Sequence, residues 1–536
     1  MQPTKLAKAR WRNFLWMVVS MLVISGCSMV GPDFVEPQAP TGQEWLASED
    51  ARLRTESTDY RNWWAVLNDP VLTTLIESAY RQNLPLQITG LRILEARALL
   101  GIATGNIYPQ VQQGRGEFAY TRISENTANT AAGFDQKYGE ASLGFDAGWE
   151  LDIWGKFRRA IESGEANLEA SVADYDDVLV SLTAEVARVY VEIRTLEERL
   201  AVARQNVDIQ KRSLEIADVR FEAGAVTELD VQQAKSLLTN TQALIPSLEA
   251  RLRQAKNALA ILLGKLPGEV DQVLKESGSI PGVPDEVIVA MPAELLRRRP
   301  DVRFAEYQLA VQSPLIGVAK ADLYPSFELF GSIGLRSADS NLTAAGSSDY
   351  SDLLDADSLE IFAGPGFRWN LFNYGRIKNR IRVEDARFQQ LLVNYENTVL
   401  RAQQEVEDAL VGFLKTQEQE SFLRESVNAA KRSVDLSMVQ YREGLVDYQR
   451  VLDTQRFLAD QQDQQVTTSG SVVTNLIAAY KSLGGGWQIR EGNPFVPPAM
   501  LEEMGKRTDW GDLLSPDAVQ VPIPDAERGR WRKPDW

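Results

Sequence analysis

Apolar residues between positions 179 and 200 recur at alternating intervals of three and four. The seam consists of Leu179, Leu182, Val186, Val189, Ile193, Leu196 and Leu200. This heptad spacing is typical of a helix that packs lengthwise against another helix. Proline is absent from Lys156–Arg220 and from Arg376–Arg442, so each range predicts one uninterrupted helix. At ~1.5 Å per residue such a helix is about 98 Å long and needs neighbouring rods to cover its apolar face.

The same layout occurs twice along the chain at a constant offset of 220 residues. Trp149 recurs as Trp369, Gly155 as Gly375 and Leu263-Gly264 as Leu483-Gly484. Each unit predicts two strands, one long helix, a reversal marked by glycine and a second long helix. Because the offset never changes, the two units contain rods of matched length, which indicates one body built from two repeats.

A different pattern precedes each long helix. Apolar residues occupy the odd positions from Leu143 to Ile153, and small or charged residues occupy the even ones. Such alternation predicts a strand whose two faces meet different solvents. We predict two strands in each repeat, at Gln110–Arg122 and Tyr138–Trp154 and then at Ser326–Arg336 and Leu359–Tyr374.

These strands fit either a soluble sandwich or a membrane wall. Strands of ten or more residues with aromatic ends, joined to rods that no sandwich requires, favour the wall of a membrane β-barrel. Open edges are not tolerated in lipid, so four strands cannot form such a barrel alone and several chains must contribute. We therefore expect an α+β membrane protein.

The remaining segments suggest a simple division of the chain. We predict a signal peptide over 1–26, an extended segment over 27–69, a first repeat over 70–268, a linker over 269–291, a second repeat over 292–487 and an irregular tail over 488–536. Shorter helices are expected over 70–104, with a break near Leu84-Pro85, and over 292–322. Pro314 should kink or split the latter.

Composition narrows the possible functions. The chain has 57 basic and 74 acidic residues, and this acidic balance argues against a nucleic-acid partner. It has no His and one Cys, which removes His-based catalysis, His metal sites and a disulfide framework. No Gly-rich phosphate loop is present. We expect no enzyme and no metal; a hydrolase that used carboxylates alone would need two acidic residues in one pocket, which the repeat does not suggest.

The N-terminus has the anatomy of an export signal. Basic residues precede a short apolar run over 14–24, which is too short to span a bilayer as a helix. Ile24-Ser25-Gly26-Cys27 resembles the lipobox of bacterial lipoproteins, in which the Cys carries the lipid and becomes the mature N-terminus. We expect a covalent lipid on Cys27, which would anchor the protein without spanning the membrane.

Taken together, these features resemble the outer-membrane efflux proteins, the exit ducts of tripartite export pumps. The resemblance covers nearly the whole mature chain. It rests on the lipobox followed by Gly31-Pro32-Asp33-Phe34, on the run from Leu295 to Arg303, on the turns Phe221–Gly224 and Tyr441–Gly444, and on the duplication. The lipidated subgroup that serves resistance-nodulation-division pumps is the nearest likeness. The resemblance implies a homotrimer with a 12-stranded outer-membrane barrel continued by a helical barrel in the periplasm.

The resemblance also implies a gate at the hairpin tips and an adaptor that docks on the turns around Gly224 and Gly444. Asp230, Tyr441 and Asp453 match the acidic and tyrosine positions of the family's aperture. Two positions depart from the pattern. Val446 stands where some members have a basic residue, and Arg450 stands at a second acidic aperture position, which implies a ring of mixed charge.

Plainer roles exist for the same residues. Asp230 and Asp453 follow helix reversals, where carboxylates favour the N-terminal end of a helix. Tyr441 could pack at the tip, and the two glycines suit the positive φ of a reversal. A different class of function is a lipidated periplasmic adaptor, which would have one hairpin flanked by β domains. The two hairpins, each preceded by membrane-type strands, favour the duct.

Overall fold

The computed structural model describes residues 29–38, 42, 44–46, 50–54, 60–124, 126, 135–274, 278–284, 287–288, 298–343 and 346–514. Cys27 and the predicted signal peptide lie outside the described residues, as do residues 292–297 at the start of the predicted second repeat.

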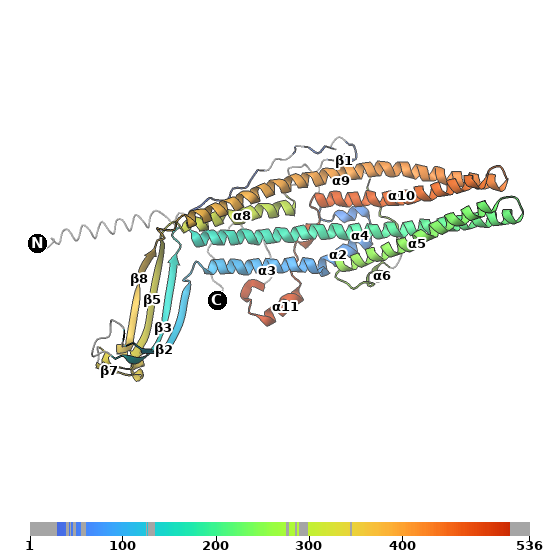
Figure 1. Ribbon diagram of the computed structural model, residues 1–536. Helices are drawn as coiled ribbons and strands as arrows, with labels where there is room; N and C mark the ends of the chain where they lie inside the picture. The colour runs from blue at the N-terminus through green and yellow to red at the C-terminus, as the bar shows by residue number, and fades with distance from the viewer. Residues whose placement is uncertain are drawn as a thin grey trace.

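Four long helices form the body of the molecule and run side by side to two adjacent turns at its far end (Figure 1). Helices α4 (Lys156–Glu222) and α9 (Arg376–Arg442) have 67 residues each. Helices α5 (Glu228–Leu262) and α10 (Tyr448–Ser482) have 35 residues each. All four keep the offset of 220 residues, which confirms the duplicated α+β fold. None of the helices in the described part of the chain combines the length and apolarity needed to cross a bilayer.

Shorter helices lie beside the half of the body that adjoins the sheet (Figure 1). They are α2 (Pro70–Gln82), α3 (Leu84–Gly105) and α8 (Pro300–Ala321). The break expected near Leu84-Pro85 is present: Asn83 ends α2 and accepts a side-chain hydrogen bond from the Leu86 amide at the start of α3. Of the two outcomes predicted at Pro314, a kink or a split, the split is wrong, because α8 continues through this residue. Pro314 is buried and α8 packs between α4 and α9, so tertiary contacts offset the lost backbone hydrogen bond.

Four antiparallel strands form one sheet that projects from the end of the helical body (Figure 1). The order is β2-β3-β5-β8, with bounds Val111–Arg122, Lys137–Leu151, Ser326–Ala338 and Leu359–Arg368. Neither β2 nor β8 has a strand partner on its outer edge among the described residues. The last strand was expected to reach Tyr374 but ends at Arg368. Tyr374 and Gly375 have φ of 49° and 82°, a left-handed turn that begins α9 and cannot belong to a strand.

Short elements connect these parts. The strands are β1 (Leu53–Arg54), which pairs in parallel with β4 (Val287–Ile288), and the loop hairpin β6 (Ser340–Thr343) and β7 (Gly346–Ser348). Helix α6 is Val270–Val273. The 3-10 turns are η1 (Trp63–Leu67), η2 (Tyr350–Leu354), η3 (Ala356–Ser358), η4 (Trp487–Arg490) and η5 (Gly511–Leu514).

The tail after residue 487 contains a helix, which corrects the expectation of an irregular segment. Helix α11 spans Pro498–Arg507, and Phe495 and Val496 are buried in the main core. Phe495 packs edge-on against Tyr175 of α4, with ring centroids 5.1 Å apart. Arg490 forms an ion pair with the fully buried Asp176, so the tail is fixed to α4 by both apolar and charged contacts.

The extended N-terminal segment lies along the body. The Val30 amide donates to the Trp154 carbonyl at 3.0 Å, and Asp33 pairs with the buried Arg159 at 2.7 Å. Further along, the Leu46 amide donates to the Glu407 carboxylate of α9 at 2.8 Å. The segment is therefore a strap that crosses from α4 at the base of the sheet to α9.

Arg299 ties the start of α8 to the second hairpin. Its side chain is buried and pairs with Asp301 at 2.8 Å and with Glu405 of α9 at 2.7 Å. It also donates to the Ser482 carbonyl at the end of α10. Arg299 is therefore a buried, ion-paired link between α8 and the second hairpin.

Candidate functional site

The two hairpin tips pack against each other through a small apolar cluster. Its buried members are Ala217 of α4, Ala234 and Leu237 of α5, Tyr441 of α9, and Tyr448, Val451 and Leu452 of α10. Every long helix contributes, so the cluster joins the first repeat to the second at the end most distant from the sheet (Figure 1). A shift of one hairpin relative to the other has to separate these residues.

Both turns have the same backbone geometry. Gly224 has φ of 70° and Gly444 of 73°, a left-handed conformation that glycine adopts without steric cost. The Ala225 amide donates to the Arg220 carbonyl at 2.8 Å, and the Leu445 amide donates to the Gln440 carbonyl at 2.9 Å. These bonds close each helix with a Schellman motif, so the requirement for glycine is structural at both tips.

Arg220, which the sequence did not single out, connects the two tips. Its guanidinium lies over the Tyr441 ring, 4.7 Å from the centroid. It also donates to the main-chain carbonyl of Tyr441, and at 3.3 Å to that of Arg442. The contact combines a cation–π interaction with hydrogen bonds to the C-terminal end of a helix, where a positive charge is favourable. The sequence contains one signal for this residue: its counterpart in the second repeat, 220 residues later, is Gln440, so the arginine is specific to the first repeat.

Tyr441 is enclosed at the interface between the hairpins. The residue is 2% exposed, and its ring packs edge-on against Tyr448 at 5.2 Å. The hydroxyl has no hydrogen-bond partner among the described residues. Burial raises the pKa of Tyr441, the Arg220 charge opposes the rise, and Asp230 adds to it. The hydroxyl is thus neutral and available for a hydrogen bond if the tips rearrange.

Asp230 lies in the first turn of α5. Its carboxylate accepts from the Thr227 amide at 3.2 Å, which caps the helix N-terminus. The capping role foreseen as the plainer alternative is therefore present. Asp230 is also near enough to Tyr441 for its charge to act on the hydroxyl, so one carboxylate adjoins both the turn and the interface.

The other predicted gate residues have separate positions. Arg450 and Asp453 are exposed on α10, and Asp453 accepts from the Gln449 amide at 2.8 Å. No contact joins either side chain to Asp230 or Tyr441 in the described part of the protomer. Val446 is half-buried and packs against the tip cluster. The structure therefore brings together Asp230, Tyr441 and Val446, and leaves Arg450 and Asp453 on the surface of one chain.

Polar contacts join the hairpins above the tip cluster. The Asn206 amide donates to Gln462 at 3.0 Å, and Gln455 donates to Ser213. Buried Gln210 has neither side-chain polar atom hydrogen-bonded within the described residues. Nearer the sheet the seam of α4 is apolar, through residues such as Val186 and Ile193. Polar pairs can be exchanged for water when helices separate, so this part of the interface opens at lower cost than the apolar part.

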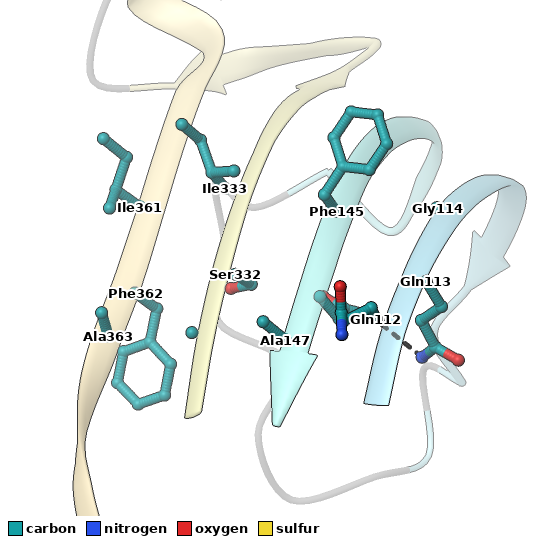
Figure 2. A pocket seen from close by; sticks show the side chains of 12 residues that line it. Gln112, Gln113, Gly114, Phe145, Ala147, Ser332, Ile333, Ile361, Phe362 and Ala363 are labelled. Atoms are coloured by element: carbon teal, nitrogen blue, oxygen red, sulfur yellow. Dashed lines mark hydrogen bonds between the residues drawn. The ribbon is translucent and has the colours of Figure 1, made fainter. Parts of the chain in front are cut away.

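The sheet has one apolar and one charged face. Phe145, Ile333 and Ile361 pair across three strands on the apolar face, where the only charges are Arg122 and Lys137 at the loop end. A hollow of about 580 Å³ is lined by residues of all four strands, most of which lie on the apolar face. Figure 2 shows the side chains of these lining residues. The opposite face has the remaining charges: Arg115, Glu117, Glu140, Asp146, Glu150, Glu328, Arg336, Glu360 and Arg368. The two faces suit lipid and water respectively.

No group of three or more His, Cys, Asp or Glu side chains could hold a metal ion in the part of the chain that the structure describes. The hairpin tips and the two-faced sheet are therefore the features on which function can be argued.

Comparisons with known proteins agree with this geometry. The family model "Outer membrane efflux protein" matches residues 75–265 and 291–485, which correspond to the two repeats. Nodulation protein T of Rhizobium leguminosarum bv. trifolii is 30% identical over 82% of this chain and 90% of its own length. The pyoverdine export outer membrane protein OpmQ of Pseudomonas putida is 30% identical over 87% of this chain and 96% of its own length.

A solved structure gives the same result for the fold. The outer-membrane channel OprN is 30% identical, covers 86% of this chain and 99% of its own length, and superposes with a TM-score of 0.78. The duplicated hairpins, the strands with one apolar face and these matches lead to one conclusion: the chain belongs to the outer membrane efflux protein family, whose members are outer-membrane efflux channels.

Proposed function

We propose that this chain is the exit duct of a tripartite efflux system and acts as a homotrimer. The observation that carries the proposal is the four-stranded sheet with one apolar face, one charged face and two open edges, joined to hairpins about 100 Å long. Three copies supply twelve strands, a number that closes a barrel and leaves no edge in lipid. The long hairpins then continue the water-filled path across the periplasm.

The surface of α9 supports association with further copies. Val393, Leu400 and Val411 are exposed and lie at intervals of seven and eleven residues, which places them on one face of the helix. An exposed apolar stripe of this kind is typical of a surface that a partner covers. In a trimer the partner is a second copy of the same chain.

The other partners follow from the family. An inner-membrane pump of the resistance-nodulation-division class would supply the energy, and a periplasmic adaptor would dock on the turns at Gly224 and Gly444 with Val446 beside them. A lipid on Cys27 would hold the start of the strap at the outer membrane. The duct itself does no chemistry on its cargo. Pyoverdine, which the name of one relative specifies, marks one substrate class among several that a polar tunnel admits.

The resting gate involves the contact between Arg220 and Tyr441. Arg220 holds the tip of α4 to the C-terminal end of α9, and the charge of Asp230 acts on the Tyr441 hydroxyl. Adaptor binding at the turns would shift the hairpins and break this contact, and the polar interface above it would allow the helices to part. Arg450 and Asp453, exposed in one protomer, would face neighbouring copies around the aperture.

Planar-bilayer conductance of the detergent-extracted protein tests the proposal. We expect a small wild-type conductance that rises several-fold in Arg220→Ala and in the Asp230→Ala, Tyr441→Phe double variant. Arg442→Ala is the matched control: it removes an arginine side chain from the same tip, and among the described residues that side chain forms one long hydrogen bond, to the Met438 carbonyl at 3.4 Å. Its conductance should equal that of the wild type.

Two other outcomes are informative. Equal conductance in all variants would retain the duct and move the gate to other residues, Arg450 and Asp453 first. If folded protein of every kind forms no pore, the duct is wrong and a lipidated periplasmic adaptor or scaffold becomes the better hypothesis.

A further inference from the structure

We propose that the charged face of the sheet contains a binding site for planar aromatic cations, built around Phe330 and Phe362. The proposal rests on the proposed function, because it takes the charged face as the wall of the channel lumen. Beyond that function, the proposal names a class of cargo, planar aromatic cations, that can bind to the lumen wall while it passes through the channel.

Two phenylalanines interrupt an otherwise polar surface. Phe330 of β5 and Phe362 of β8 stack with ring centroids 5.3 Å apart and an interplanar angle of 28°. Strand register places both on the charged face, since Phe362 pairs with Ser332 and Phe330 with Gly364. Phe362 is 60% exposed. Apolar rings that are exposed to water gain by covering their surface with a ligand.

Glycine residues on the neighbouring strands leave room for the Phe330 ring. Phe330 lies between Gly148 on β3 and Gly364 on β8, and its ring edge would be 2.9 Å from a Cβ at Gly366. Glycine at position 366 therefore leaves room for the Phe330 ring, and a Cβ at Gly364 would come within 4.0 Å of it. The result is a flat aromatic platform with room for a planar molecule to stack on it.

The surrounding charge favours a cation. Glu150 and Glu328 lie directly opposite each other on neighbouring strands, two residues from Gly148 and Phe330. Their nearest basic partners are Lys156 at 3.7 Å and Arg368 at 3.2 Å. Like charges in a directly opposed pair repel each other, so a bound cation would relieve them. Carboxylates also outnumber guanidiniums on this face of the described sheet.

A polar hollow lies on the other side of the pair. It measures about 190 Å³, and its lining includes Ser332, Asp146 and Glu360. Ser332 is the residue opposite Phe362 in the β5–β8 register, so the hollow and the platform are contiguous. A ligand that stacks on the rings can therefore place a polar substituent in the hollow.

Channel blockade tests the proposal. Ethidium, a planar aromatic monocation, is added on the loop side of the channel in a planar bilayer. Tetraethylammonium controls for charge without a ring, and 2-naphthalenesulfonate for a ring with the opposite charge. We expect ethidium to block the wild-type current at the lowest concentration of the three. The Phe330→Leu, Phe362→Leu variant should raise its half-blocking concentration about 5- to 10-fold and leave the tetraethylammonium block unchanged.

A matched pair of rings provides the control. Phe327 and Phe367 lie on the same two strands but on the apolar face, with centroids 6.5 Å apart. The Phe327→Leu, Phe367→Leu variant should leave ethidium block unchanged. If the Phe330, Phe362 double variant forms no pore, Phe362→Leu alone replaces it, because this exposed ring supports little of the fold. Equal ethidium block in the variant and the wild type, or equal block by the three probes, would overturn the site and leave the channel intact. A wild type without any conductance would overturn both.

Discussion

Helix α4 of the first repeat and helix α9 of the second hold equivalent positions, yet their apolar residues have different surroundings. Val180 is 4% exposed, whereas its counterpart Leu400 is 52% exposed. The same contrast holds for Ala173 and Val393, and for Val191 and Val411. Helix α4 contacts α2, α3, α5, α8 and α10, while α9 packs mainly against α8 and α10. No residue of α9 before Tyr395 is buried.

The contrast shows what a hydrophobic pattern does and does not determine. Both helices keep an apolar surface, but the surface of α4 is covered by its own chain and that of α9 is exposed in one copy. Duplication therefore produced one hairpin that builds the protomer core and a second whose uncovered face is suited to assembly. Three pairs of substitutions at equivalent positions test this division.

The largest difference is expected for an acidic residue at positions 180 and 400. Val180→Asp places a charge without a partner in the core and should cost about 4 kcal/mol or more, so that the protomer fails to fold. Leu400→Asp should leave the fold intact and prevent assembly. Circular dichroism measures folding, and light scattering in detergent measures the oligomer. A folded, fully assembled Leu400→Asp protein would show that the α9 stripe is not an interface.

A smaller difference between the repeats, in the free energy of unfolding, is expected at the equivalent positions Asp177 of α4 and Asn397 of α9. Burial, together with the charge of Asp301, raises the pKa of Asp177 to about 6. The folded-state pKa is above the unfolded value of about 4, so the contribution of Asp177 to stability is full below pH ~4 and is lost as pH rises through 6. Asp177→Asn should therefore raise the free energy of unfolding by about 1–2 kcal/mol at pH 7.5 and by little at pH 4.

The reverse substitution in the second repeat is the control. Asn397 is exposed, so Asn397→Asp should change stability by about 0.5 kcal/mol or less at either pH. The thermal midpoint of the four protein–pH combinations measures both effects. A midpoint for Asp177→Asn that does not depend on pH would mean that Asp177 is ionised without penalty.

The smallest difference is expected at the turns, where the repeats are alike. Gly224→Ala and Gly444→Ala each force a side chain into a left-handed conformation, at a cost of about 1 kcal/mol. The costs should be equal, since the added Cβ meets no atom within 4 Å at Gly224 and only Arg220 Nη2 at 3.8 Å at Gly444. Hydrogen exchange of the Ala225 and Leu445 amides measures the local loss of stability at each turn. Gly101→Ala, in the helical interior of α3 with open space around it, should show none.

Much of the fold could be predicted because its signals are local. Heptad spacing and the absence of proline located α4 and α9 to within two residues, and alternation located the strands. The errors arise where tertiary packing, rather than the local sequence, determines the secondary structure. Pro314 remains helical because α8 packs against α4 and α9. In the tail, Phe495 and Val496 are buried in the core, and α11 follows them in the sequence. Arg220 escaped notice for a related reason: its partner, Tyr441, is 221 residues away on the other hairpin.

The open edges of the sheet have a consequence for how the protein reaches its membrane. One copy presents the outer edges of β2 and β8, and two associated copies still present one edge of each kind. Every intermediate short of a closed ring leaves a row of unsatisfied amides and carbonyls, which lipid cannot accept. If the proposed trimer forms, insertion and association would therefore be a single event, and each copy would have to be kept from pairing its strands with a wrong partner until then.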